Sequence, residues 1–483
     1  MPAKLELLSP DIVQRVLDEA FQLLHAPGVK VQSDEARRLL LEAGAQSKDE
    51  IVSLPESLVR RALETAPAQF ALYDREGRAA VQYGGDAVHF DPGSSAVNVL
   101  DPETLEHRPA RSADLLRLVK VTEVLAQFDA QSTAVVCHDV PQAIADIYRL
   151  YLVLRFSRKP VVTGAFSSAT AQQMIDMLAL VAGGHEALAQ KPRAVFDVCP
   201  SPPLIWSEFG ANNLITLARA GVPAEMVSMP LAGAAAPVTL IGAVVQHAAE
   251  CLSGIAIHQL AQPGSPIVWG GAPAIFDMRQ GTTPMGAMET AMIDAAYTQV
   301  GKALGLPTHT YLGASDAKVV DAQAGLESGM TALVGALAGV NMISGAGMLD
   351  FLACQSAEKL VLDAEGIAMA RRLLQGIQVH TETLALEMFA DFAFKGDFLK
   401  QKITRRLFRE EQHLPSPVVD RGSLRAWQEA GRQDALARAH QRVQELLAAY
   451  EETPVAQEEA EALTSMMSAL AASVSLEKLP DVL

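Results

Sequence analysis

The feature of the sequence that most constrains the fold is an alternation that recurs through the middle of the chain. Short runs of apolar and β-branched residues are separated, in most cases, by segments with helical periodicity. There are eight such runs: AVHFD from Ala87, STAVVCHD from Ser132, PVVTGAF from Pro160, AVFDVCPS from Ala194, EMVSMPLAG from Glu225, PIVWGGAP from Pro266, THTYLGAS from Thr308 and GVNMISGAG from Gly339. Eight strands alternating with helices predict an α/β protein built on a (β/α)8 TIM barrel.

The apolar runs are nearly continuous in character, which is what burial on both faces of a parallel sheet requires. Most of them finish in Gly, Ser, Asp, His or Pro. In a barrel, the carboxyl ends of the strands meet at one mouth, and ligands bind there. The polar side chains expected at this mouth are His89, Asp91, His138, Asp139, Asp197, His309 and Asn341.

The sequence predicts helical regions on both sides of a barrel that spans residues 83–353. In the N-terminal region, 1–82, the segment SDEARRLLLEAGA has Ser33 as a helix N-cap and ends on Gly44. The C-terminal extension, 354–483, carries long helical patterns that we expect to wrap the barrel or to join subunits. A homo-oligomer is therefore expected.

Composition narrows the partners and the compartment. With 56 acidic and 39 basic residues, a net charge of −17 and no sustained basic block, the chain is not expected to bind nucleic acid. Its four cysteines form no CxxC pair, which suits a reducing cytoplasm and predicts no metal site. There is no signal-peptide pattern, and Asn341 and Ser344 interrupt the apolar segment from Met330 to Ala353, so we expect a cytoplasmic protein outside the membrane.

Aromatic residues stand at or beside the ends of several runs, whereas the HExxH, GxSxG, Walker A and GxGxxG signatures do not occur. Rings that converge on one mouth would form a cage for a quaternary ammonium, whose positive methyl groups are attracted to aromatic faces. Each ring taken alone is better explained by core packing. The candidates for substrate binding are Phe90, Phe166, Phe196, Trp269 and Tyr311.

A polar segment, GASDAKVVDAQAGLESGMT, follows the seventh run. Asp316 and Lys318 are compatible with a carboxylate beside a Schiff-base lysine, but an ion pair that ties the loop to the rim explains them without a further motif. Gln323 and Glu327 are four residues apart and share one helical face. We expect these four side chains to shape the mouth around the substrate, and the sequence assigns no residue a catalytic role.

Four blocks, residues 96–115, 229–250, 266–290 and 316–377, resemble the trimethylamine methyltransferase family in the same order, and the likeness extends over nearly the whole chain. Only standard amino acids occur, so the chain resembles the branch without pyrrolysine. That resemblance implies a (β/α)8 barrel that moves a methyl group from a methylated amine to Co(I) of a separate corrinoid protein. It further implies a quaternary amine such as glycine betaine as the substrate, and no tightly bound cofactor.

One position departs from the family pattern. Many relatives carry His in the motif that reads NMISGAG here, where this chain has Ser344. If that His helps to bind the substrate carboxylate, Ser344 implies a different betaine or another methylated amine, and Ser344 joins the candidate substrate-binding residues.

Three alternatives remain open at the level of sequence. The chain is also compatible with a methyltransferase for a tertiary methylamine, and with a protein of the same fold that binds a methylated amine as a sensor without transferring methyl. An unrelated lyase that uses Lys318 as a Schiff-base nucleophile is the third.

Overall fold

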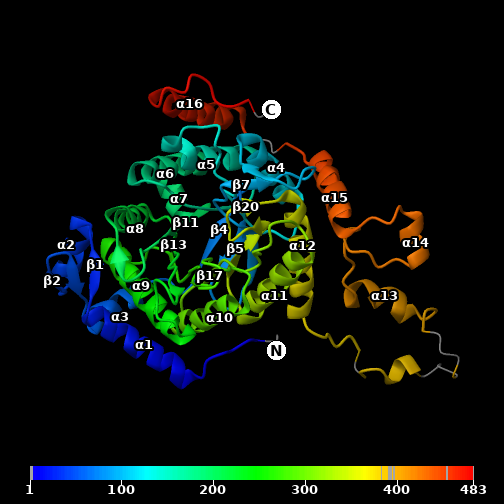
Figure 1. Ribbon diagram of the computed structural model, residues 1–483, viewed down its shortest axis with the longest axis horizontal. Coiled ribbons are helices and arrows are strands. Elements are labelled where there is room, and N and C mark those ends of the chain that lie inside the picture. The colour runs from blue at the N-terminus through cyan, green and yellow to red at the C-terminus, as the bar shows by residue number, and fades with distance from the viewer. Residues whose placement is uncertain (1–3, 382, 390–393, 395–397, 453–454, 482–483) are drawn as a thin grey trace.

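Parallel strands lie at the centre of the molecule and helices surround them (Figure 1). The computed structural model describes residues 4–381, 383–389, 394, 398–452 and 455–481, and it is a mixed α/β structure. Each of the eight predicted runs overlaps or directly adjoins one of the central strands. These are β6 (His89–Pro92), β9 (Gln131–Ser132), β10 (Val161–Thr163), β11 (Ala194–Val198), β13 (Ala224–Met226), β15 (Ile267–Val268), β17 (His309–Thr310) and β18 (Met342–Ala346).

The central strands pair in chain order as two parallel sheets, β9-β10-β11-β13-β15 and β17-β18-β6. A parallel bridge between Trp269 and Thr308 joins β15 to β17. At the other edge, the Asp129 backbone N–H donates to the Phe90 carbonyl at 2.9 Å, which places the start of β9 beside β6. This succession is the one expected for a barrel.

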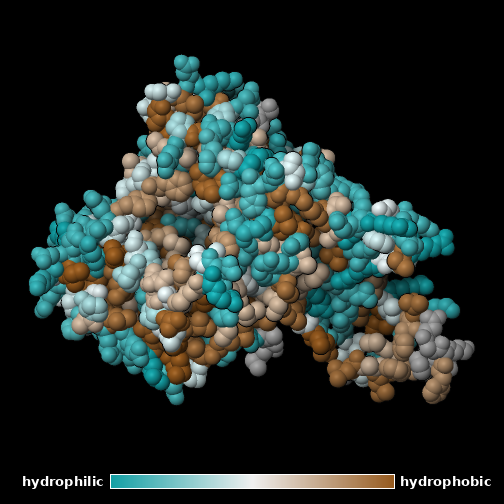
Figure 2. All heavy atoms as spheres, in the orientation of Figure 1, coloured by the Kyte–Doolittle hydropathy of each residue, from teal (hydrophilic) through white to brown (hydrophobic). Residues whose placement is uncertain are grey.

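A helix follows each central strand and covers its outer face (Figure 1). Several of these helices begin at a Ser, Thr or Asp whose side chain accepts a backbone N–H of the first turn, as in α6, α8, α9, α11 and α12. The helices are α4 (Ser112–Val124), α5 (Ala145–Phe156), α6 (Ser168–Ala182), α8 (Glu208–Ala220), α9 (Leu240–Ala261), α10 (Met288–Ala303), α11 (Ala322–Ala338) and α12 (Ala357–Leu374), with the short α7 (His185–Gln190) and the 3-10 turn η1 (Gln142–Ile144) between them. Figure 2 shows the surface hollowed in the middle of this ring of helices.

The N-terminal region is not wholly helical, in contrast to the prediction. It holds three helices, α1 (Pro10–His25), α2 (Asp34–Glu42) and α3 (Glu56–Thr65), and five short strands, β1 (Val29–Val31), β2 (Gln46–Lys48), β3 (Ile51–Ser53), β4 (Phe70–Tyr73) and β5 (Ala79–Tyr83). Helices α1 and α3 pack on α9, and β1 pairs with β12 (Ile205–Trp206). The antiparallel hairpin β4-β5 packs its apolar side chains against the central strands.

Further short strands extend the loops that follow the central strands. Strands β14 (Leu231–Ala232) and β16 (Ala274–Ile275) pair in parallel, and β7 (Asn98–Leu100), β8 (His107–Pro109), β19 (Met348–Leu349) and β20 (Cys354–Gln355) form a four-stranded sheet. These pairs connect the loops that follow the first, fifth, sixth and eighth central strands.

The C-terminal part contains η2 (Leu386–Phe389), α13 (Lys402–Glu411), α14 (Leu424–Glu429), α15 (Ala435–Ala449) and α16 (Gln457–Ser473). Helix α15 packs on α12 and α4, and α16 packs on α5 and α6 (Figure 1). Helix α12 was predicted within the extension, but it packs between α11 and α4 as the helix that follows β18. The boundary expected at residue 354 therefore separates α12 from the strands that it covers.

Among the described residues, one helix, α9, is long and apolar enough to cross a membrane by length and composition. Most of its residues are buried against α1, α3, α8 and α10. The apolar segment from Met330 to Ala353, which drew attention in the sequence, divides here between α11, β18 and β19.

Candidate functional site

The inner face of the central strands carries two layers of side chains. The lower layer is apolar and includes the hairpin β4-β5; its members are Leu72, Val81, Tyr83, Ala130, Val162, Val195, Val268 and Met342. Residues two positions further along a strand point to the same face. Two positions after the strand members stand Ser132, Gly164, Asp197, Gly270 and Ser344. The inner face thus changes from apolar to polar toward the carboxyl ends of the strands.

A buried hydrogen-bond network occupies the polar layer. Ser344 Oγ donates to Asp91 Oδ1 and lies 3.0 Å from Nε2 of His309. The same nitrogen lies 3.2 Å from Oε1 of Glu225, and the Tyr83 hydroxyl donates to Oε2 of Glu225 at 3.2 Å. All five side chains are buried. The network links β6, β13, β17, β18 and the hairpin.

Burial drives the groups of this network toward their uncharged forms. It raises the pKa of Asp91 and of Glu225 well above the ordinary carboxyl value, and the negative charge of Asp197 raises that of Glu225 further. Burial also lowers the pKa of His309 to about 3. The close contact between His309 and Glu225 therefore joins a neutral imidazole to a carboxyl group that favours its proton.

Asp197 is the carboxylate that keeps its charge at neutral pH. Burial raises its pKa to about 6, while hydrogen bonds from Tyr311 and Glu225 and the charge of Arg149 oppose this rise. The Tyr311 hydroxyl donates to Oδ2 of Asp197 at 2.7 Å. Asp197 is partly exposed, and Gly164 beside it contributes no side chain to the polar layer. A negative charge is thus accessible at the carboxyl ends of β10 and β11.

A buried guanidinium lies at the same end of the strands. Nη1 of Arg149, on α5, donates to Oγ of Ser95 and to the carbonyl of Thr133, both at 2.9 Å. The ring of Phe166 covers the guanidinium at 4.5 Å and is itself 43% exposed. Burial lowers the pKa of Arg149 to about 10, so the group remains a cation at neutral pH.

The five predicted aromatic residues are not brought into one cage. Tyr311 bonds to Asp197 on the inner face, and Phe166 covers Arg149. Phe90, Phe196 and Trp269 are instead buried in the large apolar core that the strands share with the helices. Each of them precedes or follows an inner-face residue by one position, and the strand period of two turns their rings outward.

The polar segment after β17 orders the loop that it belongs to. Asp316 accepts backbone N–H groups from Met285 at 2.8 Å and Gly286 at 3.0 Å. Glu327 accepts from Ser315 Oγ at 2.6 Å and from the Asp316 N–H at 2.8 Å. Gln323 Nε2 donates to the other oxygen of Glu327 at 2.8 Å. These contacts fasten the loops after β15 and β17 to the first turns of α11.

Lys318 is placed as a surface residue. Its side chain is 55% exposed, and Nζ lies 3.2 Å from Oδ1 of Asp350 and 3.9 Å from the ring centre of Phe351. Nζ also donates to the Asp316 carbonyl at 2.5 Å. A Schiff-base lysine is typically desolvated in an apolar pocket, whereas the Lys318 side chain is exposed.

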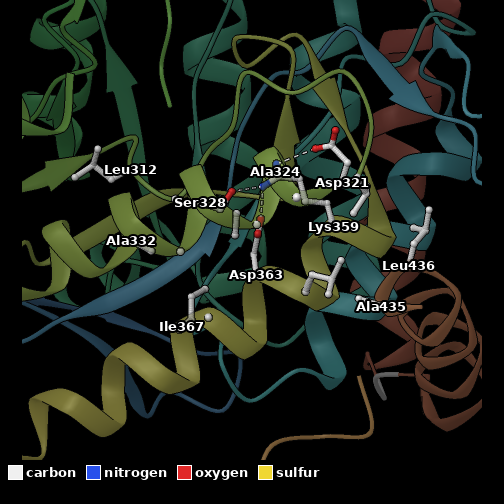
Figure 3. Close-up of a pocket in the computed structure, with 18 of the residues that line it drawn as sticks. Leu312, Asp321, Ala324, Ser328, Ala332, Lys359, Asp363, Ile367, Ala435 and Leu436 are labelled. Carbon is white, nitrogen blue, oxygen red and sulfur yellow. Dashed lines mark hydrogen bonds and ion pairs between the residues drawn. The ribbon is translucent and has the colours of Figure 1, made fainter. Parts of the chain in front are cut away.

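A cavity of about 490 Å³ lies outside the strands, between α11, α12 and the start of α15 (Figure 3). Phe90 belongs to its wall. Lys359 points toward Ser328 and Asp363 in the close-up, and its Nζ bonds to both side chains, at 2.7 Å and 2.6 Å. Because these charged groups satisfy one another, the cavity offers a ligand mainly apolar walls.

Arg149, Glu225 and Tyr83 are the members of the site that sequence reasoning missed. Arg149 is a buried cation in the middle of the largely apolar helix ADIYRLYLVLRF, and Glu225 is a carboxylate inside a buried strand. A charged residue in a buried element is itself a signal, because such residues are seldom buried without a partner. No group of three or more His, Cys, Asp or Glu side chains in the described part of the chain is arranged to hold a metal ion. All four cysteines are free thiols.

Comparison with known proteins places this geometry in a family. The family model described as trimethylamine methyltransferase matches residues 2–474. The chain is 31% identical to a trimethylamine methyltransferase of Desulfitobacterium hafniense over 92% of this chain and 90% of that protein. It is 33% identical to a trimethylamine methyltransferase of Methanosarcina barkeri, with 94% and 92% covered. A glycine betaine methyltransferase of Desulfitobacterium hafniense is 28% identical, with 92% and 93% covered.

The crystal structure of the Methanosarcina barkeri monomethylamine methyltransferase shares the fold, with a TM-score of 0.55, 12% identity, and 92% of this chain and 88% of that chain covered. The family predicted from the sequence is confirmed, and so is the prediction of an enzyme. The chain belongs to the trimethylamine methyltransferase family and is a methyltransferase.

Proposed function

We propose that this enzyme moves a methyl group from a quaternary amine of the glycine betaine type to Co(I) of a separate corrinoid protein. The observation that carries the proposal is the pair of opposite charges at the carboxyl ends of the strands. Asp197 with Tyr311 suits a quaternary ammonium, and Arg149 suits an anionic group. The remaining titratable groups of the polar layer favour their neutral forms.

The proposal includes a closed (β/α)8 barrel. Support comes from the order of the strands and from the contacts that connect the two sheets, at Trp269 and Thr308 on one side and at Phe90 and Asp129 on the other. In such a barrel, the ends of β11 and β17 and the start of α5 open on one mouth. A corrinoid protein that docks there reaches the substrate from the open side.

The proposed reaction requires no proton transfer by the protein. A methyl carbon of the quaternary ammonium is transferred to Co(I); its C–N bond breaks as the carbon–cobalt bond forms. The electron pair of the broken bond stays on nitrogen, the amine leaves as a neutral tertiary amine, and methyl-Co(III) is the other product. No general acid is needed. The protein holds the cation, aims one methyl group at the mouth and excludes water.

A second candidate, demethylation of a tertiary methylamine, is favoured by one observation. Asp91 and Glu225 have raised pKa values, so the polar layer holds carboxyl protons at neutral pH. A neutral tertiary amine must gain a proton on nitrogen before it can leave as a secondary amine. A protonated carboxyl group in this layer is a source of that proton.

The deciding experiment is methylation of Co(I) followed by spectroscopy. The purified enzyme is mixed with Co(I) cobalamin without oxygen, and glycine betaine, proline betaine, carnitine, choline, dimethylglycine and trimethylamine are added singly. Formation of methyl-Co(III) with a carboxylated quaternary amine supports the proposal, and formation with trimethylamine alone supports the second candidate. If no amine reacts even with a cognate corrinoid protein, but one binds, the proposed reaction fails. The exposed aspartate Asp176 provides the control variant D176N, for which an unchanged rate is expected.

Two further features belong to the proposal. We propose that copies of the chain associate through the C-terminal helices α13 to α16, which lie outside the ring of helices (Figure 1). Light scattering on the purified protein measures this directly, and a monomer at micromolar concentration contradicts it. We also propose that the enzyme works in the cytoplasm, because a reaction that consumes Co(I) needs reducing conditions.

A further inference from the structure

One edge of the Arg149 guanidinium has no hydrogen-bond partner within the part of the chain that the structure describes. Nη1 makes both of the bonds that hold the group, to Ser95 and Thr133. Nε and Nη2 have none, although both atoms are buried. An unpaired buried cation is costly, and buried polar atoms in folded proteins nearly always have partners. The free edge therefore points to a ligand.

The free edge has the geometry of a carboxylate site. Nε and Nη2 present two parallel N–H groups, the fork that a carboxylate accepts with both of its oxygens. The neighbouring carboxylates are engaged elsewhere. Asp146 accepts the backbone N–H groups of Ile147 at 2.9 Å and Phe166 at 2.6 Å, and Asp197 accepts the Tyr311 hydroxyl.

An opposite charge, on Asp197, stands near enough to act on Arg149. The negative charges of Asp146 and, less strongly, of Asp197 raise the pKa of Arg149 against the effect of burial, yet neither carboxylate makes a hydrogen bond to the guanidinium. Gly164, which follows β10, lies beside Asp197 and adds no side chain; a Cβ there would approach Asp197 at 3.5 Å. The protein thus presents a cation and an anion that do not neutralise each other by direct contact.

We propose that Arg149 binds the carboxylate of the substrate while Asp197 and Tyr311 hold its ammonium group, so that the site selects betaines over amines without a carboxylate. This inference rests on the proposed function, which it sharpens by naming the residue that sets the substrate class. Phe166 stacks over the face of the guanidinium at 4.5 Å, so its ring leaves the in-plane edge with Nε and Nη2 to the ligand. Ser95, itself exposed, positions the guanidinium through Nη1.

The test compares two ligands that differ in one group. Glycine betaine carries a carboxylate where choline carries a hydroxymethyl group. Isothermal titration without any corrinoid is expected to show that the enzyme binds glycine betaine at least about tenfold more tightly than choline. In R149Q, the affinity for glycine betaine falls about 10- to 100-fold, since hydrogen bonds to a charged group are lost, while the affinity for choline changes little. R149K keeps the positive charge but loses the two parallel N–H groups, and its affinity for glycine betaine should lie between those of the wild type and R149Q.

Arg75 supplies the matched control. It is a partly buried arginine that also has an unpartnered nitrogen, Nη1, but it lies beside α16 and pairs with Glu459. R75Q is expected to retain the preference for glycine betaine. If R149Q does not fold, S95A replaces it in the test, because this change removes one hydrogen bond that fixes the guanidinium. The affinity for glycine betaine should then fall by about threefold to tenfold, and the affinity for choline should not change.

Two results would overturn the inference: equal affinity of the wild-type enzyme for both ligands, or an equal loss for both ligands in R149Q. Methyl transfer is measured separately. A selective loss of glycine betaine binding in a protein that never methylates Co(I) supports the Arg149 site and refutes the proposed reaction. Methylation of Co(I) by choline at the rate seen with glycine betaine supports methyl transfer from a quaternary amine and refutes the selective role of Arg149.

Discussion

Two places in the described part of this molecule bring a buried cation near a carboxylate, and they differ in how the charges are satisfied. Between α11 and α12, Lys359 bonds directly to Asp363 and Ser328, and the Gly347 N–H donates to Asp363 at 2.7 Å. At the ends of the central strands, Arg149 and Asp197 influence each other without bonding, and Arg149 keeps two nitrogens unpaired.

The difference separates a structural pair from a binding site. A buried ion pair that satisfies itself fixes the arrangement of the elements that carry it, and a ligand gains little from it. A buried charge with an unmet hydrogen-bonding edge has a cost that a ligand of opposite charge removes. The charges between the helices satisfy one another, whereas the guanidinium at the strand ends keeps two unpaired nitrogens.

The largest effect is expected from Lys359→Met. This change leaves Asp363 buried without its cation, and removal of one partner from a buried pair costs about 3–5 kcal/mol of the free energy of unfolding. Denaturation by urea measures this loss. In the folded fraction, the ratio of the affinities for glycine betaine and choline should stay at its wild-type value, because the helix cavity takes no part in substrate selection.

The double variant K359M/D363L serves as the control. It removes both charges and should recover most of the stability, since an apolar replacement of a buried pair is often neutral. A loss below about 1 kcal/mol in K359M, or a changed ligand ratio, would contradict the structural role of this pair.

The next effect concerns the pH dependence of binding. Asp197 has a pKa of about 6 and is faced by Asp91, Glu225, Tyr311 and Arg149. Its negative charge is present above pH 6 and is lost as pH falls below it. The affinities for choline and glycine betaine should therefore both fall by about tenfold between pH 7.5 and pH 5, since only about a tenth of a group with this pKa is ionised at pH 5.

Asp197→Asn is the control for this titration. The variant should bind both ligands weakly at pH 7.5, and its pH profile should be flat near pH 6. Because burial raises the pKa of the folded protein above that of the unfolded chain, the ionised form costs stability as pH rises through this range. The variant should accordingly melt at a higher temperature than the wild type at pH 8. An unchanged pH profile would show that another group titrates.

The overall pattern of strands was accessible from the sequence because parallel strands buried on both faces leave continuous apolar runs. The strands of the N-terminal region were not, since QSK and IVS are three residues long and too short to show a period. The position of α12 was also hidden. Its sequence has charged residues that read as an exposed helix, whereas Glu358, Lys359 and Asp363 are buried and paired.

The site was only partly accessible for a related reason. The aromatic cage was predicted from rings near strand ends, but Phe90, Phe196 and Trp269 fall on the outer side of the strand period. Asp91, Asp197 and His309 were among the polar candidates. Because Asp91 follows Phe90 and Asp197 follows Phe196, the strand period of two already indicated that the carboxylates and these rings lie on opposite faces. Arg149 required three-dimensional structure, because its partners Ser95 and Thr133 follow other strands. The role of Ser344 stays a prediction, although the structure places it in the polar layer between Asp91 and His309.

The smallest effect is expected from Lys318→Ala. Lys318 forms an ion pair with Asp350 at the surface, and exposed pairs contribute about 0–1 kcal/mol. Methyl transfer in K318A should stay within about twofold of the wild-type rate, a change that matches the small free energy of such a pair. Glu327→Ala should be more harmful, because Glu327 holds both Ser315 and the Asp316 backbone in the loop after β17. A complete loss of activity in K318A, together with a borohydride-trapped adduct on Lys318, would restore the Schiff-base lyase and move the chemistry from the strand ends to the rim.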